Sequence, residues 1–82
     1  MKATKNAELR RAILSIPYNI SEVPESITMQ DVVKQWPLLS ESGCSPIAIL
    51  TMANSNDESV LSDYWMREFM RVLNWNNGYH TS

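Results

Sequence analysis

Cys44 and His80 are the side chains of this 82-residue sequence best suited to metal binding or nucleophilic catalysis. A structural zinc site normally takes four ligands of the cysteine and histidine type, and the sequence holds one of each. A cysteine nucleophile needs a base that a third group orients, and no motif places such a group beside His80. We therefore expect no catalytic site, no metal site and no cofactor.

Phosphate-binding loops and membrane segments are also not expected from this sequence. Gly43 and Gly78 are its two glycines, which are too few for a Gly-rich phosphate loop, and we expect no small-molecule ligand. No window approaches the run of about 18 apolar residues that a membrane helix needs. One cysteine, and no apolar signal stretch near residue 1, predict a cytoplasmic protein.

The distribution of positive charge bears on nucleic-acid binding. The formal net charge of −2 disfavours nonspecific binding, because proteins that contact phosphates usually present a basic surface. Between Lys34 and Arg67 there is no Lys or Arg, so a helix-turn-helix in that stretch would read DNA without a basic side chain. The alternative hypothesis, a small dimeric DNA-binding transcriptional regulator, depends on contacts from the first helix. Its candidate residues are Lys2, Lys5, Arg10 and Arg11.

Length and composition predict one folded domain. The hydrophobic content of 44% and the charged content of 20% are ordinary for a globular protein. Chains of this size bury a marginal core, so association with another chain is an option from the start. We expect an all-α domain over residues 1–82, a small bundle of about four helices, with frayed tails at 1–5 and 79–82.

Two helices are predicted in the first half of the chain. Apolar residues at spacings of three and four indicate an amphipathic helix over 6–16. A second helix, over about 29–36, opens with the capping-box pair Thr28 and Asp31. It should end before Pro37, whose ring removes a hydrogen-bond donor and restricts the preceding residue.

Two more helices are predicted in the second half. Ser45, followed by proline, is a good N-cap for a helix that ends near Asn54. Ser55 and Glu58 have capping-box spacing and would start the last helix, which should continue through Trp75. We expect this last helix to be the longest, and to serve as the packing centre or as an oligomerisation element.

The apolar side chains of the last helix cover an arc of about 240°, at about 100° of rotation per residue. A stripe of about 100° is enough for a helix on the surface of a monomer. Either the helix is wrapped by the other three, or part of the arc packs against another chain, as aromatic residues and Met do at interface cores. The residues predicted to form a protein interface are Trp65, Met66, Phe69, Met70 and Leu73.

Together these patterns favour a noncatalytic regulatory protein. We expect it to bind another protein, as an inhibitor or antirepressor that sequesters a transcription factor or an enzyme. Self-association as a homo-oligomer is a second use of the same apolar arc, and the sequence does not separate the two.

Overall fold

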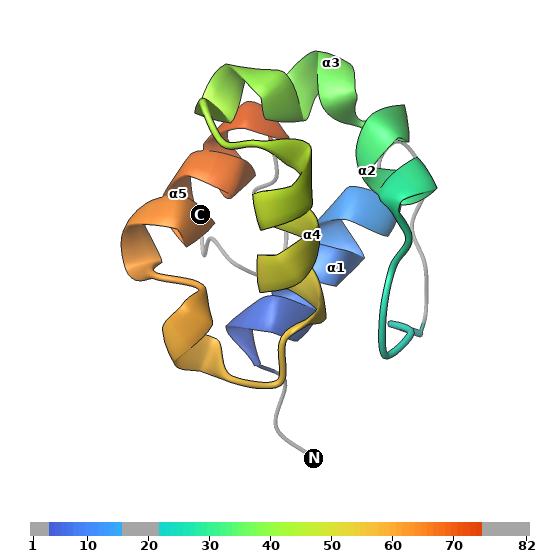
Figure 1. Ribbon diagram of the computed structural model, residues 1–82, viewed down its shortest axis with the longest axis vertical. Helices are drawn as coiled ribbons and strands as arrows, with labels where there is room; N and C mark the ends of the chain where they lie inside the picture. The colour runs from blue at the N-terminus through green and yellow to red at the C-terminus, as the bar shows by residue number, and fades with distance from the viewer. Residues whose placement is uncertain (1–3, 16–21, 75–82) are drawn as a thin grey trace.

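A computed structural model describes residues 4–15 and 22–74, and this part of the chain is helical without any strand (Figure 1). The prediction of an all-α fold is confirmed, with five α-helices and two short 3-10 helices in the described part. The elements are α1 (Lys5–Ser15), α2 (Met29–Lys34), α3 (Trp36–Leu39), η1 (Ser40–Ser42), α4 (Pro46–Asn54), η2 (Glu58–Val60) and α5 (Asp63–Val72).

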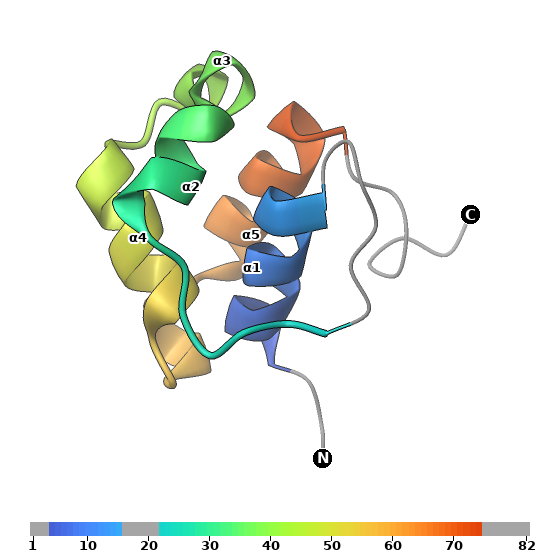
Figure 2. The same cartoon turned by 90° about the vertical axis from the view of Figure 1, so that its right-hand side faces the viewer.

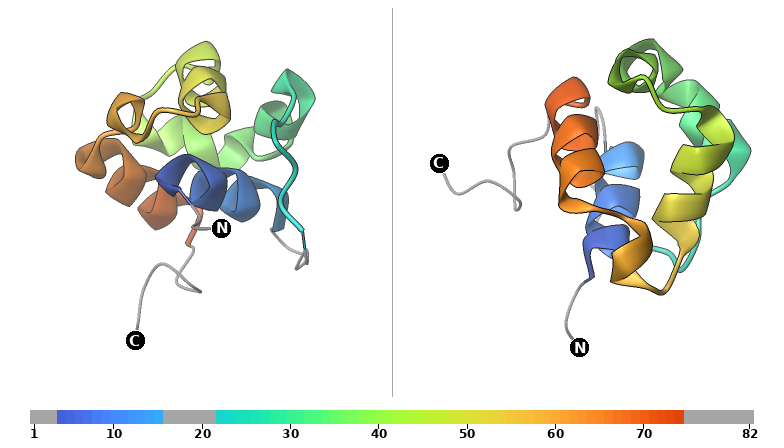
Figure 3. Two further views of the ribbon diagram at one scale, coloured as in Figure 1. Left: turned by 90° about the horizontal axis from the view of Figure 1, so that it is seen from below. Right: turned by 60° about the vertical axis from the view of Figure 1, so that its left-hand side comes forward.

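Helix α1 joins the two halves of the fold. It packs against α2 and α4 on one side and against α5 on the other (Figures 2 and 3). Leu9, Ala12 and Ile13 of α1 are buried in these contacts. The expectation that the last helix is the longest is corrected, because α5 has 10 residues and α1 has 11. The central position expected of the last helix is taken by α1, which contacts α2, α4 and α5, and the alternative role of the last helix in oligomerisation stays a prediction. Lys5, which we had expected in a frayed tail, is the first residue of α1.

Two polar side chains of α1 are buried because they bind the carboxyl end of α4. Asn6 Nδ2 donates to the carbonyl oxygen of Met52 at 2.7 Å, and Arg10 Nη1 donates to that of Ala53 at 2.8 Å. The last carbonyls of a helix have no partner within it and carry partial negative charge, which a cation stabilises. Asn6 and Arg10 thus supply the partners that α4 lacks.

The connector, residues 22–28, is held to the same end of α4. Asn54 accepts a hydrogen bond from the Ile27 amide at 2.8 Å and donates one to the Ile27 carbonyl at 2.9 Å. Arg10 Nε donates to the carbonyl of Pro24 at 2.8 Å. These contacts fix a segment that lies outside the helices and leads into the N-cap of α2.

The predicted caps of α2 and α4 are confirmed. Thr28 and Asp31 form a reciprocal capping box at the start of α2. Ser45 accepts a hydrogen bond from the Ala48 amide, and α4 ends at Asn54 as expected. The end of the second helix differs, because α2 stops at Lys34 and the next residues open the short helix α3, with proline in its first turn.

The last helix begins later than predicted, at Asp63 instead of directly after Ser55. The Ser55 hydroxyl accepts a hydrogen bond from the Asp57 amide at 3.0 Å, so it closes a local turn after α4 and does not cap a helix. Leu61 then has extended backbone and is buried, which separates η2 from α5. Ser62 is the N-cap of α5, and its Oγ accepts from the Trp65 amide at 3.2 Å.

The last helix also ends before the predicted position. Asn74 has a φ of 56°, the left-handed conformation that often follows a helix C-terminus. Helix α5 therefore ends at Val72, two residues after Met70. The predicted end at Trp75, and the predicted tail at 79–82, lie outside the described residues.

Replacing Ser62 with alanine should destabilise the protein by about 1 kcal/mol, because the cap of α5 loses its side-chain acceptor. Urea denaturation followed by circular dichroism measures the free energy of unfolding. Ser40→Ala is the control, since Ser40 is an exposed serine at the start of η1. Equal losses for the two variants would contradict a capping role for Ser62.

Candidate protein-binding surface

Three aromatic rings of α5 lead from the core to the surface. Phe69 is fully buried, and the ring of Trp65 stacks on it with centroids 5.5 Å apart and an interplanar angle of 21°. Tyr64 meets Trp65 edge to face at 5.1 Å and has 56% of its surface exposed. We call Tyr64 and Trp65 the aromatic surface. It is an exposed apolar feature that is anchored in the core.

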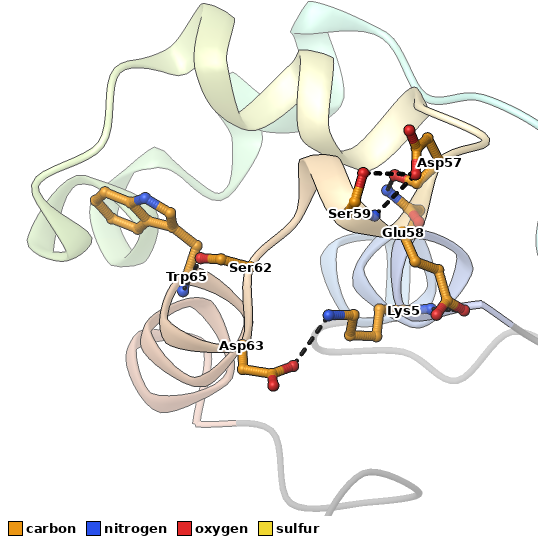
Figure 4. Close-up of polar contacts among 8 residues, drawn as sticks. Lys5, Asp57, Glu58, Ser59, Ser62, Asp63 and Trp65 are labelled. Atoms are coloured by element: carbon orange, nitrogen blue, oxygen red, sulfur yellow. Dashed lines mark hydrogen bonds and ion pairs between the residues drawn. The ribbon is translucent and has the colours of Figure 1, made fainter.

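The start of α5 holds the aromatic surface in place. Ser62 caps the turn that contains both rings, and Figure 4 shows its hydroxyl beside the amide of Trp65. Leu61 before the cap and Met66 after it are both fully buried, at the two positions of a hydrophobic staple. A side chain that is already ordered loses little conformational entropy when it binds, so this arrangement favours recognition.

The amino-terminal side of the aromatic surface carries acidic residues. Lys5 Nζ lies 2.9 Å from Asp63 Oδ1, and the Lys5 amide donates to Glu58 at 3.2 Å (Figure 4). The hydrogen bond and the charge of Lys5 lower the pKa of Asp63. Asp57, in turn, accepts from the amide and hydroxyl of Ser59, which lowers its pKa. Asp57 and Asp63 are therefore ionised at neutral pH.

The carboxyl-terminal side carries basic residues. Arg71 Nη2 lies 2.7 Å from Glu68 Oε1, and this contact raises the pKa of Arg71. Arg67, one turn before Arg71, is exposed. Each side of Tyr64 therefore carries an ion pair, Lys5 with Asp63 before it and Arg71 with Glu68 after it.

The predicted protein interface requires correction. Met66, Phe69, Met70 and Leu73 are each between 0 and 2% exposed, in a core shared with α1 and other elements. No partner can reach them without opening the fold, and of the five predicted residues Trp65 alone is half-buried. The wide apolar arc is covered because α1, α3 and η1 all pack against α5.

No family model, curated protein or solved structure matches this chain. Among the described residues, no group of three or more His, Cys, Asp or Glu side chains is arranged to hold a metal ion. No helix in that part of the chain is both long and apolar enough to cross a membrane.

The residues of the DNA-binding alternative do not form a basic surface. Arg10 is buried on main-chain carbonyls, so its proposed role as a phosphate contact is corrected. Lys5 pairs with Asp63, and Arg11 is half-buried. Lys2 lies outside the described residues. What remains is too little positive charge to favour that alternative.

Sequence reasoning missed Tyr64 as a candidate. Its neighbours Asp63 and Arg67 are exposed and charged, and that placement was the available signal that Tyr64 faces solvent. The arc of about 240° that we predicted for the last helix includes Tyr64, because it was drawn from residue type and helical rotation alone. Tyr64 lies at the edge of this arc, and the structure leaves that edge exposed.

Proposed function

We propose that the protein is a noncatalytic regulator that binds another protein through the aromatic surface. Its action is that of an inhibitor or antirepressor, which covers a surface that a transcription factor or an enzyme needs. The observation that supports this is the continuous stack from buried Phe69 through Trp65 to exposed Tyr64. Tyr and Trp side chains dominate binding energy at many interfaces, especially when they are held rigid.

The charges around Tyr64 specify how a partner would approach. The exposed acids Asp57 and Glu58 lie before it in the chain, and the exposed Arg67 follows it. The charges of Asp63 and Arg71 are already paired within the protein, with Lys5 and Glu68. A partner with positive charge facing η2 and negative charge facing the end of α5 would be steered into one orientation. Rim charges of this kind mainly set the association rate and the specificity, while the aromatic rings supply the affinity.

A photo-crosslinking amino acid at position 64 should capture the partner in cells that naturally make the protein. The same amino acid at position 33 is a matched control, because Tyr64 and Val33 are 56% and 57% exposed and lie on different helices. We expect a distinct covalent product at 64 that is absent at 33, identified by mass spectrometry. Identical products at both positions, or none at 64, would reject the aromatic surface as the binding site.

With the captured partner purified, Tyr64→Ser should weaken binding at least tenfold. An exposed anchor of this kind typically contributes about 2 kcal/mol or more, and its loss should leave the helical content unchanged. Calorimetric titration measures the affinity, and Val33→Ser should retain it. An unchanged affinity for Tyr64→Ser would assign the binding energy elsewhere.

A further inference from the structure

The connector and helix α2 contribute little to the apolar core. We call them together the strap, residues 22–35. Of the 15 buried apolar side chains in the described part of the chain, the strap supplies two, Ile27 and Val32. Every other side chain of the strap is exposed or half-buried. Ordering each residue has an entropic cost that the burial of apolar groups must offset, so a segment with so few buried groups is weakly held.

Polar side chains of α1 and α4 attach the strap to the rest of the protein. Arg10 Nε donates to the carbonyl oxygen of Pro24 at 2.8 Å. The Asn54 side chain accepts from the Ile27 amide at 2.8 Å and donates to the Ile27 carbonyl at 2.9 Å. A hydrogen bond has a modest net effect on stability, because water replaces the partner when the contact opens. These attachments can therefore break and form again at a modest cost.

The strap ends at Gln35, between two helices. Gln35 is the C-cap of α2, and its φ of −99° and ψ of 10° lie outside the helical range, so α2 and α3 are separate elements. Its side-chain amide donates to the carbonyl oxygen of Ile13 at 3.2 Å. Beyond this point Leu39 is fully buried, and α3 packs against α5. Gln35 therefore marks the boundary between the strap and the better-packed remainder.

The remainder of the described fold is held together by contacts that do not involve the strap. Asn6 Nδ2 and Arg10 Nη1 bind carbonyls at the end of α4, and Lys5 pairs with Asp63 of α5. All the buried apolar side chains other than Ile27 and Val32 belong to this remainder. Figure 1 shows the strap, in teal and green, at one edge of the molecule and α5, in orange, at the opposite edge.

We propose that the strap opens as a unit while α1, α4 and α5 stay packed. Proteins open locally in cooperative segments, and the elements that move on binding are drawn from the less stable of these segments. Opening exposes Arg10 Nε and the Asn54 side chain, which bind the strap when it is closed. Because the strap binds α1 and α4 and the aromatic surface lies on α5, this inference does not rest on the proposed function.

Amide hydrogen exchange of the full chain, followed by NMR spectroscopy, tests this opening. The amides of Ile27 and Val32 report on the strap, since they donate to Asn54 and to the Thr28 carbonyl. Amides at the centre of α1 report on the remainder. We expect the two strap amides to be at least about tenfold less protected than those of α1, because they exchange without global unfolding. Equal protection in the two groups would overturn the inference.

Two substitutions separate opening of the strap from global unfolding. Ser62→Ala should speed exchange in α1 about fivefold through global unfolding, but should leave the Ile27 amide unchanged, because the cap of α5 stays intact when the strap opens. Asn54→Ala should speed exchange of the Val32 amide about fivefold or more, because both hydrogen bonds to Ile27 are lost. Asn56→Ala makes the same change at an exposed asparagine beyond α4 and should have no such effect.

Either variant can overturn the proposal. If Ser62→Ala speeds exchange at Ile27 and in α1 by the same factor, the strap opens only when the whole protein unfolds. If Asn54→Ala and Asn56→Ala both leave the Val32 amide as in the wild type, Asn54 does not hold the strap closed. None of these results depends on capture of a partner at position 64.

Discussion

Replacing Phe69 with alanine is expected to destabilise the protein by about 3 to 5 kcal/mol, the usual cost of emptying an aromatic site in a core. Phe69 is fully buried and supports the ring of Trp65, so the variant loses both core contacts and the stack. Domains of this size have a total stability of about 5 to 10 kcal/mol, so the variant should be close to unfolding at 37 °C. Thermal and urea denaturation followed by circular dichroism would measure the loss.

The matched comparison is Tyr64→Ala on the same helix. Because Tyr64 is largely exposed, its removal should change stability by no more than about 0.5 kcal/mol. The pair separates the two roles that the sequence left open for this helix. A Phe69→Ala variant that keeps its stability and loses association would place Phe69 at an interface, against the structure described above.

Arg10→Ala should cost about 2 to 4 kcal/mol, although it removes a charged residue from a short amphipathic helix. The guanidinium donates to the carbonyls of Pro24 and Ala53, and hydrogen bonds to a charged group each contribute about 1.5 to 3 kcal/mol when buried partners are left unpaired. Burial lowers the pKa of Arg10, while the charge of Glu25 raises it. The melting temperature should fall by roughly 10 to 25 °C.

Two neighbouring substitutions sharpen the Arg10 test. Arg11→Ala changes the adjacent, half-buried residue and should stay within about 0.5 kcal/mol of the wild type. Arg10→Lys should fall between the wild type and Arg10→Ala, because an ammonium lacks the fork that reaches two carbonyls. Similar losses for Arg10→Ala and Arg11→Ala would show that the charge of α1, and not these contacts, carries the stability.

Local chemistry made some of the fold predictable from sequence. The capping box at Thr28 and the Ser45 cap are decided by residues three or four apart, and both occur as predicted. The predicted start of the last helix was wrong because Ser55 and Ser62 are both plausible caps by spacing. Ser62 is the cap in the structure because Leu61, the residue before it, is buried between η2 and α5. No local sequence pattern predicts that burial.

The central position of α1 and the location of the candidate surface could not be predicted, because both depend on contacts between residues far apart in the sequence. Asn6 and Arg10 look like part of a solvated helix face, and their carbonyl partners lie in α4, 46 and 43 residues away. The same limit applies to the predicted interface, since the arc of α5 is hidden by α1, α3 and η1. The pattern of apolar residues therefore distinguished helices from loops well, but it distinguished buried residues from exposed ones poorly.

The position of α1 in the fold also constrains how the protein can be made. Ribosomes synthesise α1 before α4 and α5, yet the Ala53 carbonyl that binds Arg10 and the Asp63 carboxylate that binds Lys5 lie 43 and 58 residues later in the chain. Until α4 and α5 have emerged, α1 can pack against α2 but lacks most of the surface that buries its apolar stripe. The nascent chain therefore exposes part of this stripe until α5 is complete, and chaperones that bind apolar segments should associate with it up to that point.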